Sequence, residues 1–206
     1  MRHIQKLLTL VIVVCVAAPG LAHAQAAGDP TIWFGGSLGL SPLGTVKGQI
    51  NLPPVGVFNT SQDSATGFQI NALIDVRVAP FLSIGFAPGL LLNVKPSNGN
   101  DSGSMIDLPL RVTLGAPVAP KVRLYGFASP GYSILFPPSG NDNAGHPSGF
   151  MIGFGGGVGY RVAPKIAVTG ELGYQFRFLS STVNGLDASA DVDYLTIALG
   201  VVAAIN

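Results

Sequence analysis

The sequence predicts an all-β protein, an eight-stranded antiparallel up-and-down transmembrane β-barrel that follows an N-terminal signal peptide. Valine followed by Ala-Pro recurs at Ala79-Pro80, Ala119-Pro120 and Ala163-Pro164, at spacings of 40 and 44 residues. A run of alternating apolar and polar residues lies on either side of each, and longer segments rich in Gly, Asn, Ser and Pro join the other ends of these runs. Short turns at one end and long loops at the other are typical of a transmembrane barrel.

The first 24 residues are interpreted as a secretory signal peptide, which leaves residues 25–206 as the barrel domain. Arg2 and Lys6 give a basic start, the apolar stretch at 7–18 follows, and small residues precede a cleavage site between Ala24 and Gln25. An apolar stretch of 12 residues is too short to span a bilayer. The only cysteine, Cys15, leaves with this segment, so disulfides and cysteine metal sites are excluded from the remainder.

Composition argues against a nucleic-acid partner and for strands in a membrane. Charged residues make up 10% of the chain, against about 25% in ordinary soluble domains. The leader takes two of the 11 Lys and Arg, which leaves nine scattered singly against ten Asp and Glu and no basic patch. Beyond the leader no apolar run is long enough for a membrane helix. Lipid-facing strands escape a hydropathy search because only every second residue is apolar.

Alternation places eight strands near 31–42, 66–78, 81–94, 105–115, 121–134, 149–162, 165–179 and 191–205. The fourth is the clearest, with Ile106, Leu108 and Leu110 on one face and Asp107 and Arg111 on the other. The outer loops are then 43–65, 95–104, 135–148 and 180–190, the first being the longest. In the fifth strand the aromatic pair Tyr125 and Phe127 shares the side of Arg123, which suggests a bulge.

The apolar face is expected to point outward, into lipid. A water-facing exterior would be about 25–35% charged, and a charge on the lipid side costs roughly 2–4 kcal/mol near the midplane. The sixth strand supports this orientation, because its second face is mostly glycine, which suits a narrow lumen. The charges should therefore face inward as a lumenal ion-pair network, comprising Asp75, Arg77, Asp107, Arg111, Arg123, Arg161, Glu171 and Arg177. Candidate aromatic anchors at the membrane interfaces are Trp33, Phe34, Phe81, Phe150, Tyr160, Tyr174 and Phe178.

Three segments carry a family resemblance. Ile106-Asp107-Leu108-Pro109-Leu110-Arg111, the aromatic-Gly-Pro run from Tyr125 to Tyr132, and the glycine-rich strand from Gly153 to Tyr160 are similar to segments of the small bacterial outer-membrane β-barrel domain of porin-like proteins, related in architecture to the OmpA and OmpX barrels. The resemblance extends over roughly 31–205. It implies a location in the bacterial outer membrane, contact with its lipid and lipopolysaccharide, assembly by the outer-membrane insertion machinery, and mostly non-enzymatic roles. We expect a monomer. The family usually ends on Phe, whereas here Ile205 stands near that place.

The sequence offers no catalytic, cofactor or metal residues that we would assign. A lipid-modifying enzyme would need a placed histidine, and His146 beside Ser148 and Asp142 lies in a Gly/Asn/Pro loop, so a solvated loop histidine is the favoured interpretation. The acidic residues Asp187, Asp191 and Asp193 lack the offsets of a calcium loop and are interpreted as solvated charges.

Two functional classes remain in view. Eight strands leave an interior just wide enough for side chains, which favours a non-enzymatic barrel with a filled lumen and a structural or surface-interaction role. The alternative is a narrow porin-like channel for small solutes. A lipid-modifying enzyme and a soluble ligand-binding barrel are less favoured.

Overall fold

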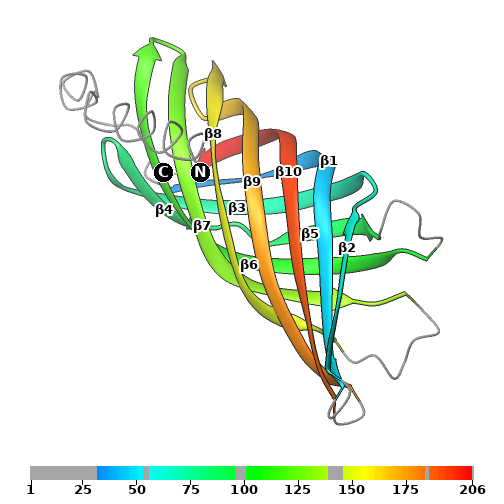
Figure 1. The fold of residues 1–206 in the computed structure, drawn as a ribbon. Coiled ribbons are helices and arrows are strands. Elements are labelled where there is room, and N and C mark those ends of the chain that lie inside the picture. Colours follow the sequence, from blue (N-terminus) through cyan, green and yellow to red (C-terminus); the bar gives the residue numbers. More distant parts are fainter. Residues whose placement is uncertain (1–31, 53–55, 96–100, 139–145, 184–185, 206) are drawn as a thin grey trace, which may run out of the picture.

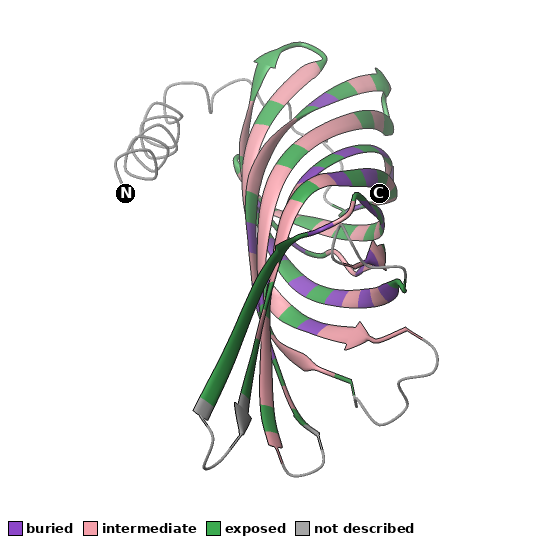
Figure 2. Ribbon diagram, turned by 45° about the vertical axis from the view of Figure 1, so that its right-hand side comes forward, coloured by how far each residue is buried: buried purple, intermediate pink, exposed green. Residues whose placement is uncertain are grey.

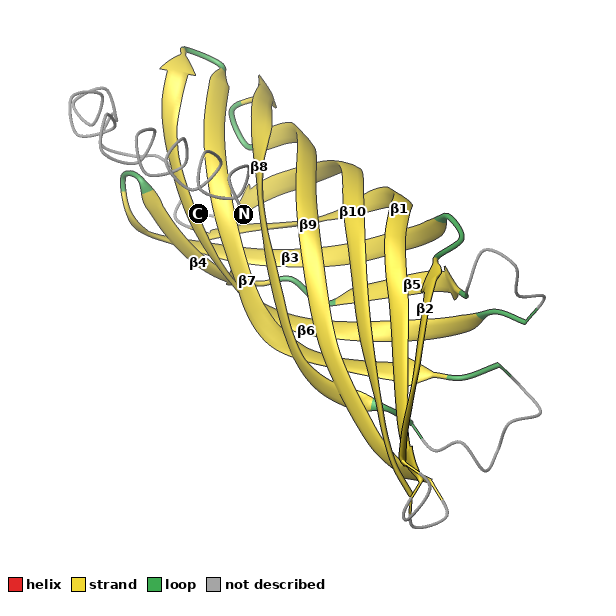
Figure 3. Cartoon of the chain, in the orientation of Figure 1, coloured by secondary structure: helices red, strands yellow, loops and turns green. Residues whose placement is uncertain are grey.

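The structure is a computed structural model that describes residues 32–52, 56–95, 101–138, 146–183 and 186–205. The described chain consists of strands and their connections (Figure 1, Figure 3). The strands are β1 (Ile32–Leu52), β2 (Gly56–Asp63), β3 (Gly67–Ala79), β4 (Leu82–Phe86), β5 (Gly89–Val94), β6 (Gly103–Ala119), β7 (Val122–Phe136), β8 (Ser148–Ala163), β9 (Ile166–Val183) and β10 (Leu186–Ile205). The predicted leader at 1–24 and its cleavage site lie outside the described residues.

The sheet closes into a ring because β1 pairs with β10 on one edge and with β3 on the other. Antiparallel neighbours then follow from β10 through β9, β8, β7 and β6, and β4 and β5 together fill the single place between β6 and β3. Eight positions therefore complete the ring. The predicted eight-stranded antiparallel barrel is confirmed.

The three Ala-Pro segments form the tight connections at one end of the barrel. They link β3 to β4, β6 to β7 and β8 to β9, and β1 and β10 begin and end at the same level, where Ile32 pairs with Ile205. We call this the short-turn end. The connections after β1, β5, β7 and β9 lie at the opposite end.

Burial alternates along the strands with apolar residues outside and polar residues inside. On β3 the outward Phe68 and Ile74 are each 54% exposed, whereas the inward Gln69 is 3% exposed. Figure 2 shows such an alternation of exposed and more buried residues along the strands. The buried polar set also includes Asp107 and Arg177. A soluble barrel would place these faces the other way round, so this arrangement contradicts the soluble ligand-binding alternative. In the described part of the chain, no helix is long and apolar enough to cross a membrane.

The predicted first outer loop at 43–65 is wrong for most of its length. β1 continues to Leu52, and β2 pairs back on it from Gly56 to Asp63. On the other edge β1 stays paired with β10, and β9 and β10 continue through most of the loop predicted at 180–190. We call the part of β1 from Leu43 onward, β2, and the adjoining ends of β9 and β10 the extension. In β2 the side chains from Val57 to Asp63 are exposed on both faces, so no alternation of apolar and polar residues marks this strand in the sequence.

Two further strand predictions need correction. The single strand expected at 81–94 is broken at Ala87-Pro88 into β4 and β5, because proline cannot donate to the ladder. The carbonyl of Pro88 still accepts from Ala72 N at 2.9 Å, so the ring stays continuous. The bulge expected in the fifth strand is also wrong. β7 pairs with β8 from Val122 to Ile134 without a register shift, and Tyr125 and Phe127 share the side of Arg123 because all three line the lumen.

Candidate functional site

The lumen is filled at the end opposite the short turns by an apolar cluster. It consists of the buried residues Leu91, Val94, Met105, Leu179, Val192 and Tyr194, with Val46, Leu135 and Ala190 packed against it. These side chains come from β1, β5, β6, β7, β9 and β10, and therefore from most of the ring. Alternation at the ends of these strands brings apolar residues inward, which excludes water from this level.

On the short-turn side of this cluster, Arg177 of β9 reaches across the lumen to Asp107 of β6. Its Nε donates to Asp107 Oδ1 at 3.0 Å and its Nη2 to Oδ2 at 2.5 Å, a bidentate pair whose side chains are 0% and 2% exposed. Ser133 of β7 donates to the same carboxylate at 2.5 Å, and Arg177 also donates to Gln175. Buried charges persist only with such partners, since removing one leaves the other uncompensated.

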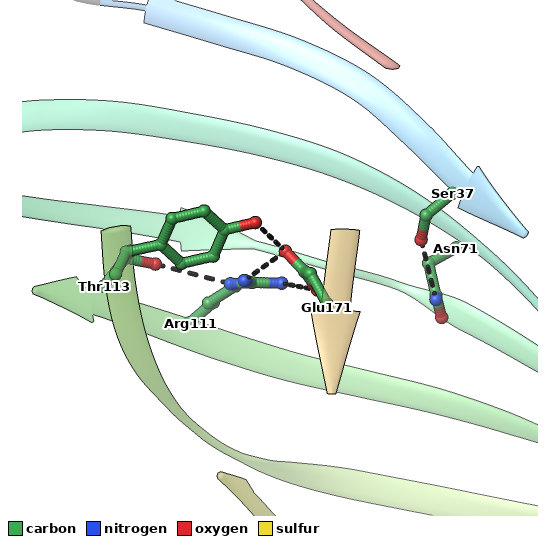
Figure 4. A network of polar contacts seen from close by, with 6 residues as sticks. Ser37, Asn71, Arg111, Thr113 and Glu171 are labelled. Atoms are coloured by element: carbon green, nitrogen blue, oxygen red, sulfur yellow. Dashed lines mark hydrogen bonds and ion pairs between the residues drawn. The ribbon is translucent and has the colours of Figure 1, made fainter. Parts of the chain in front are cut away.

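A second ion pair lies nearer the short-turn end. Arg111 of β6 donates to both carboxylate oxygens of Glu171 on β9, at 2.7 and 3.1 Å, and to Thr113 at 3.3 Å (Figure 4). The Tyr125 hydroxyl of β7 donates to Glu171 Oε1 at 2.7 Å. The Arg111 guanidinium also lies 3.9 Å from the centre of the Phe127 ring, a cation–π geometry.

Glycines of β8 make room for these rings. A Cβ built on Gly157 would lie 2.7 Å from the Tyr125 hydroxyl oxygen, and one on Gly155 would lie 2.7 Å from Phe127 Cζ. Real side chains do not approach so closely. The glycine-rich strand therefore holds the aromatic side chains that flank Arg111.

Little space remains between the two ion pairs, whereas a large cavity lies between them and the short-turn end of the barrel. The space around Asp107, Arg111 and Glu171 is about 60 Å³, room for a few water molecules. The second cavity is about 620 Å³ and reaches the short-turn rim, where Pro80, Pro120 and Lys121 line it. We call it the vestibule.

The structure places the eight predicted network residues on the inward faces of five strands. Four of them form two separate ion pairs, and the other four line the vestibule. Asp107 pairs with Arg177, and Arg111 with Glu171. Asp75, Arg77, Arg123 and Arg161 line the vestibule instead. Sequence reasoning missed Tyr125, Gln175 and Ser133 as partners of these charges, although each lies on the inward phase of its strand.

The predicted aromatic anchors at the membrane interfaces do not all lie on the outer surface. Phe34, Phe81, Phe150, Tyr160 and Phe178 are about half exposed on the outside, as interface anchors would be. Trp33 is not an anchor: it is 8% exposed and lines the vestibule, because its strand phase turns it inward.

Neither loop candidate forms a metal or catalytic cluster in the described residues. His146 lies against Phe136 with ring centres 5.0 Å apart, whereas Ser148 bonds to the Tyr132 hydroxyl at 2.8 Å, and Asp142 lies outside the described residues. Asp187 accepts from Thr182, and Asp193 from the Thr45 backbone. Among the described residues, no group of three or more His, Cys, Asp or Glu could hold a metal ion.

A closed ring with an apolar exterior and a charged, filled interior defines a small transmembrane β-barrel. A family model, the outer membrane protein beta-barrel domain, matches residues 8–204. The chain belongs to this family, and it is a protein of the bacterial outer membrane. In such barrels short turns face the periplasm and longer connections face outward, which predicts that the vestibule opens toward the periplasm and that the extension lies on the outer side of the membrane.

Solved structures share the fold at low identity. OprG from Pseudomonas aeruginosa is 12% identical with a TM-score of 0.61, over 86% of this chain and 97% of that one. The Neisserial surface protein A is 14% identical with a TM-score of 0.56, over 84% and 97%. The outer membrane protease OmpT from Escherichia coli is 13% identical with a TM-score of 0.53, over 89% and 100%. No curated protein matches the chain.

Proposed function

We propose that this protein is a non-enzymatic barrel that keeps its own lumen closed and has a structural or surface-interaction role in the outer membrane. The proposal rests on three layers of side chains that fill the lumen one after another along the barrel axis. The apolar cluster, the Arg177–Asp107 pair and the Arg111–Glu171 pair follow one another, with about 60 Å³ of space around the two pairs. A hydrated solute passing outward from the vestibule would have to displace each of them.

The surface part of the proposal rests on the extension. Among the described strands, β2 pairs with β1 on one edge only, so its other edge is unpaired. The side chains of β2 from Val57 to Asp63 are all exposed, and Ser64, which follows the strand, is buried. A strand edge beyond the ring presents backbone donors and acceptors to a partner. Neisserial surface protein A is a surface protein by its name, but its likeness to this chain is one of fold.

A non-enzymatic role is supported by the position of the candidate histidine. His146 is exposed and lies against Phe136, and Ser148, its nearest nucleophile in sequence, bonds to Tyr132. OmpT is a protease on this fold, so the fold alone does not decide the question.

The competing function is a narrow channel, which the vestibule favours. It already extends from the short-turn rim to Arg111 and Glu171, so that opening the levels above it would complete a path.

Ion efflux from liposomes tests which function holds. Wild-type protein should retain a small trapped ion, while the double variant Arg111→Ala/Arg177→Ala, which removes both ion pairs, should leak more than either single variant. Arg77→Ala is the matched control, because Arg77 lies below the closure and its loss should not open it. Steady efflux through the wild type would overturn the closed-lumen proposal in favour of the channel.

A further inference from the structure

The vestibule has the dimensions of a ligand site. Its volume of about 620 Å³ falls within the range of about 300–1,000 Å³ for small-molecule pockets. Trp33 and Tyr125 give it aromatic walls, and Leu73, Val122 and Val202 give it apolar ones. With the lumen filled above Arg111, its entrance lies at the periplasmic rim.

The vestibule is lined by more positive than negative side chains. Five cations line it, Arg77, Arg111, Lys121, Arg123 and Arg161, against two acids, Asp75 and Glu171. Arg111 is paired with Glu171, and the other charged residues that line the vestibule are four cations and one acid. Arg77, Arg123 and Arg161 have interactions of their own within the barrel, so what attracts an anion is the local excess of positive charge.

The rest of the chain does not share this excess. From residue 25 onward the chain has nine Lys and Arg and ten Asp and Glu, so more than half of these cations lie at this one cavity. The acids Asp63, Asp187, Asp191 and Asp193 lie on the extension, at the other end of the barrel. A cavity lined by one sign of charge and walled by a low-dielectric barrel concentrates counter-ions of the opposite sign.

From this geometry we propose that the vestibule binds a small polyanion that bears phosphate groups and enters from the periplasm. Arginine guanidiniums bind phosphate oxygens in a planar, bidentate way. Arg77, Arg123 and Arg161 line a space large enough for more than one phosphate. The phosphate can come from a free periplasmic solute or from the headgroup of an inner-leaflet lipid, since the rim lies at the membrane surface. This inference stands whether or not the lumen conducts.

Two lysines provide a matched pair for the test. Lys121 and Lys165 each follow a Val-Ala-Pro turn on the same rim and both are exposed, but only Lys121 lines the vestibule. Calorimetric titration of the refolded barrel in a neutral, phosphate-free detergent would use pyrophosphate as the soluble probe. Dihexanoyl phosphatidylglycerol, below its micelle concentration, is the headgroup probe.

We expect saturable binding of at least one probe, weakened about two- to fivefold by Lys121→Gln, unchanged by Lys165→Gln, and weakened at least about tenfold by the double variant Arg123→Gln/Arg161→Gln. Retained heat-dependent gel mobility would show that the double variant is folded, and Lys121→Gln tests the site if it is not. Pyrophosphate binding alone assigns a soluble ligand, and lipid binding alone assigns a headgroup. Binding of neither probe, or equal loss with Lys121→Gln and Lys165→Gln, would overturn the proposal.

Discussion

Arg177 on β9 and Asp107 on β6 form a bidentate ion pair across the lumen between strands that are not neighbours in the sheet. The pair therefore ties together opposite parts of the ring. It is nearly inaccessible to water, and Ser133 and Gln175 supply further hydrogen bonds to it.

Removing one member of this pair should destabilise the barrel more than removing both. Arg177→Met leaves Asp107 buried without its cation, which typically costs about 3–5 kcal/mol. The double variant Arg177→Met/Asp107→Leu should recover much of this loss, since buried pairs can be replaced by apolar residues at little cost. Urea unfolding in lipid vesicles measures both free energies of unfolding. A double variant that is no more stable than Arg177→Met would contradict the cost of leaving Asp107 buried without its cation.

Alanine at Gly157 should strain the lumen, whereas alanine at Gly159 should not. A Cβ at Gly157 meets the Tyr125 ring and the Gly170 carbonyl oxygen at 2.7 Å, and one at Gly159 meets its nearest atom, Tyr125 Cε1, at 3.9 Å. Overpacking of this kind costs about 1–3 kcal/mol. The difference in the unfolding free energies of the two variants is the measurement, and a tolerated Gly157→Ala would refute the close packing of Tyr125.

The Tyr125 hydroxyl should contribute through Glu171. Tyr125→Phe removes one donor to the carboxylate while it keeps the ring above the glycines, and hydrogen bonds to charged groups are worth about 1.5–3 kcal/mol. Tyr160→Phe, on the outside of β8, is the control and should be neutral. If the two variants unfold alike, Glu171 gains nothing from Tyr125.

A lysine scan should separate the membrane span from the extension. Leu110, in the middle of β6, is 60% exposed on the outer face, and Leu110→Lys should cost about 2–4 kcal/mol if it faces the bilayer core. Val57 on β2 is 51% exposed, and Val57→Lys should cost little because the extension lies in water. A comparable cost at both positions would place the extension within lipid.

The barrel and the inward and outward faces of its strands could be predicted from the sequence, because both follow from local patterns. The Ala-Pro turns mark one end, and period-two alternation, as at Leu108 and Leu110 against Asp107 and Arg111, marks the faces. The extension could not be predicted in this way. The side chains of β2 from Val57 to Asp63 are exposed on both faces, and its second half, from Asn59 to Asp63, contains no apolar residue.

The pairing of the charges was also beyond the sequence. Which arginine reaches which acid depends on the stagger between strands on opposite sides of the ring, and no local pattern records it. Arg111 donates to Thr113, two residues along the chain, but its ion-pair partner is Glu171, 60 residues away. Trp33 was misplaced for a related reason, because an aromatic at a strand end suits the lipid interface and the lumen equally well until the strand phase is known.

The closed lumen is tested most directly by thiol accessibility, since no cysteine other than Cys15 occurs in the sequence. Thr169→Cys would place a thiol on the vestibule wall and Ser61→Cys one on the exposed extension. In oriented proteoliposomes, a small charged thiol reagent added to the extension side should modify the Ser61→Cys variant and leave the Thr169→Cys variant untouched. The same reagent added to the short-turn side should give the reverse. Modification of the Thr169→Cys variant from both sides would contradict a closed lumen.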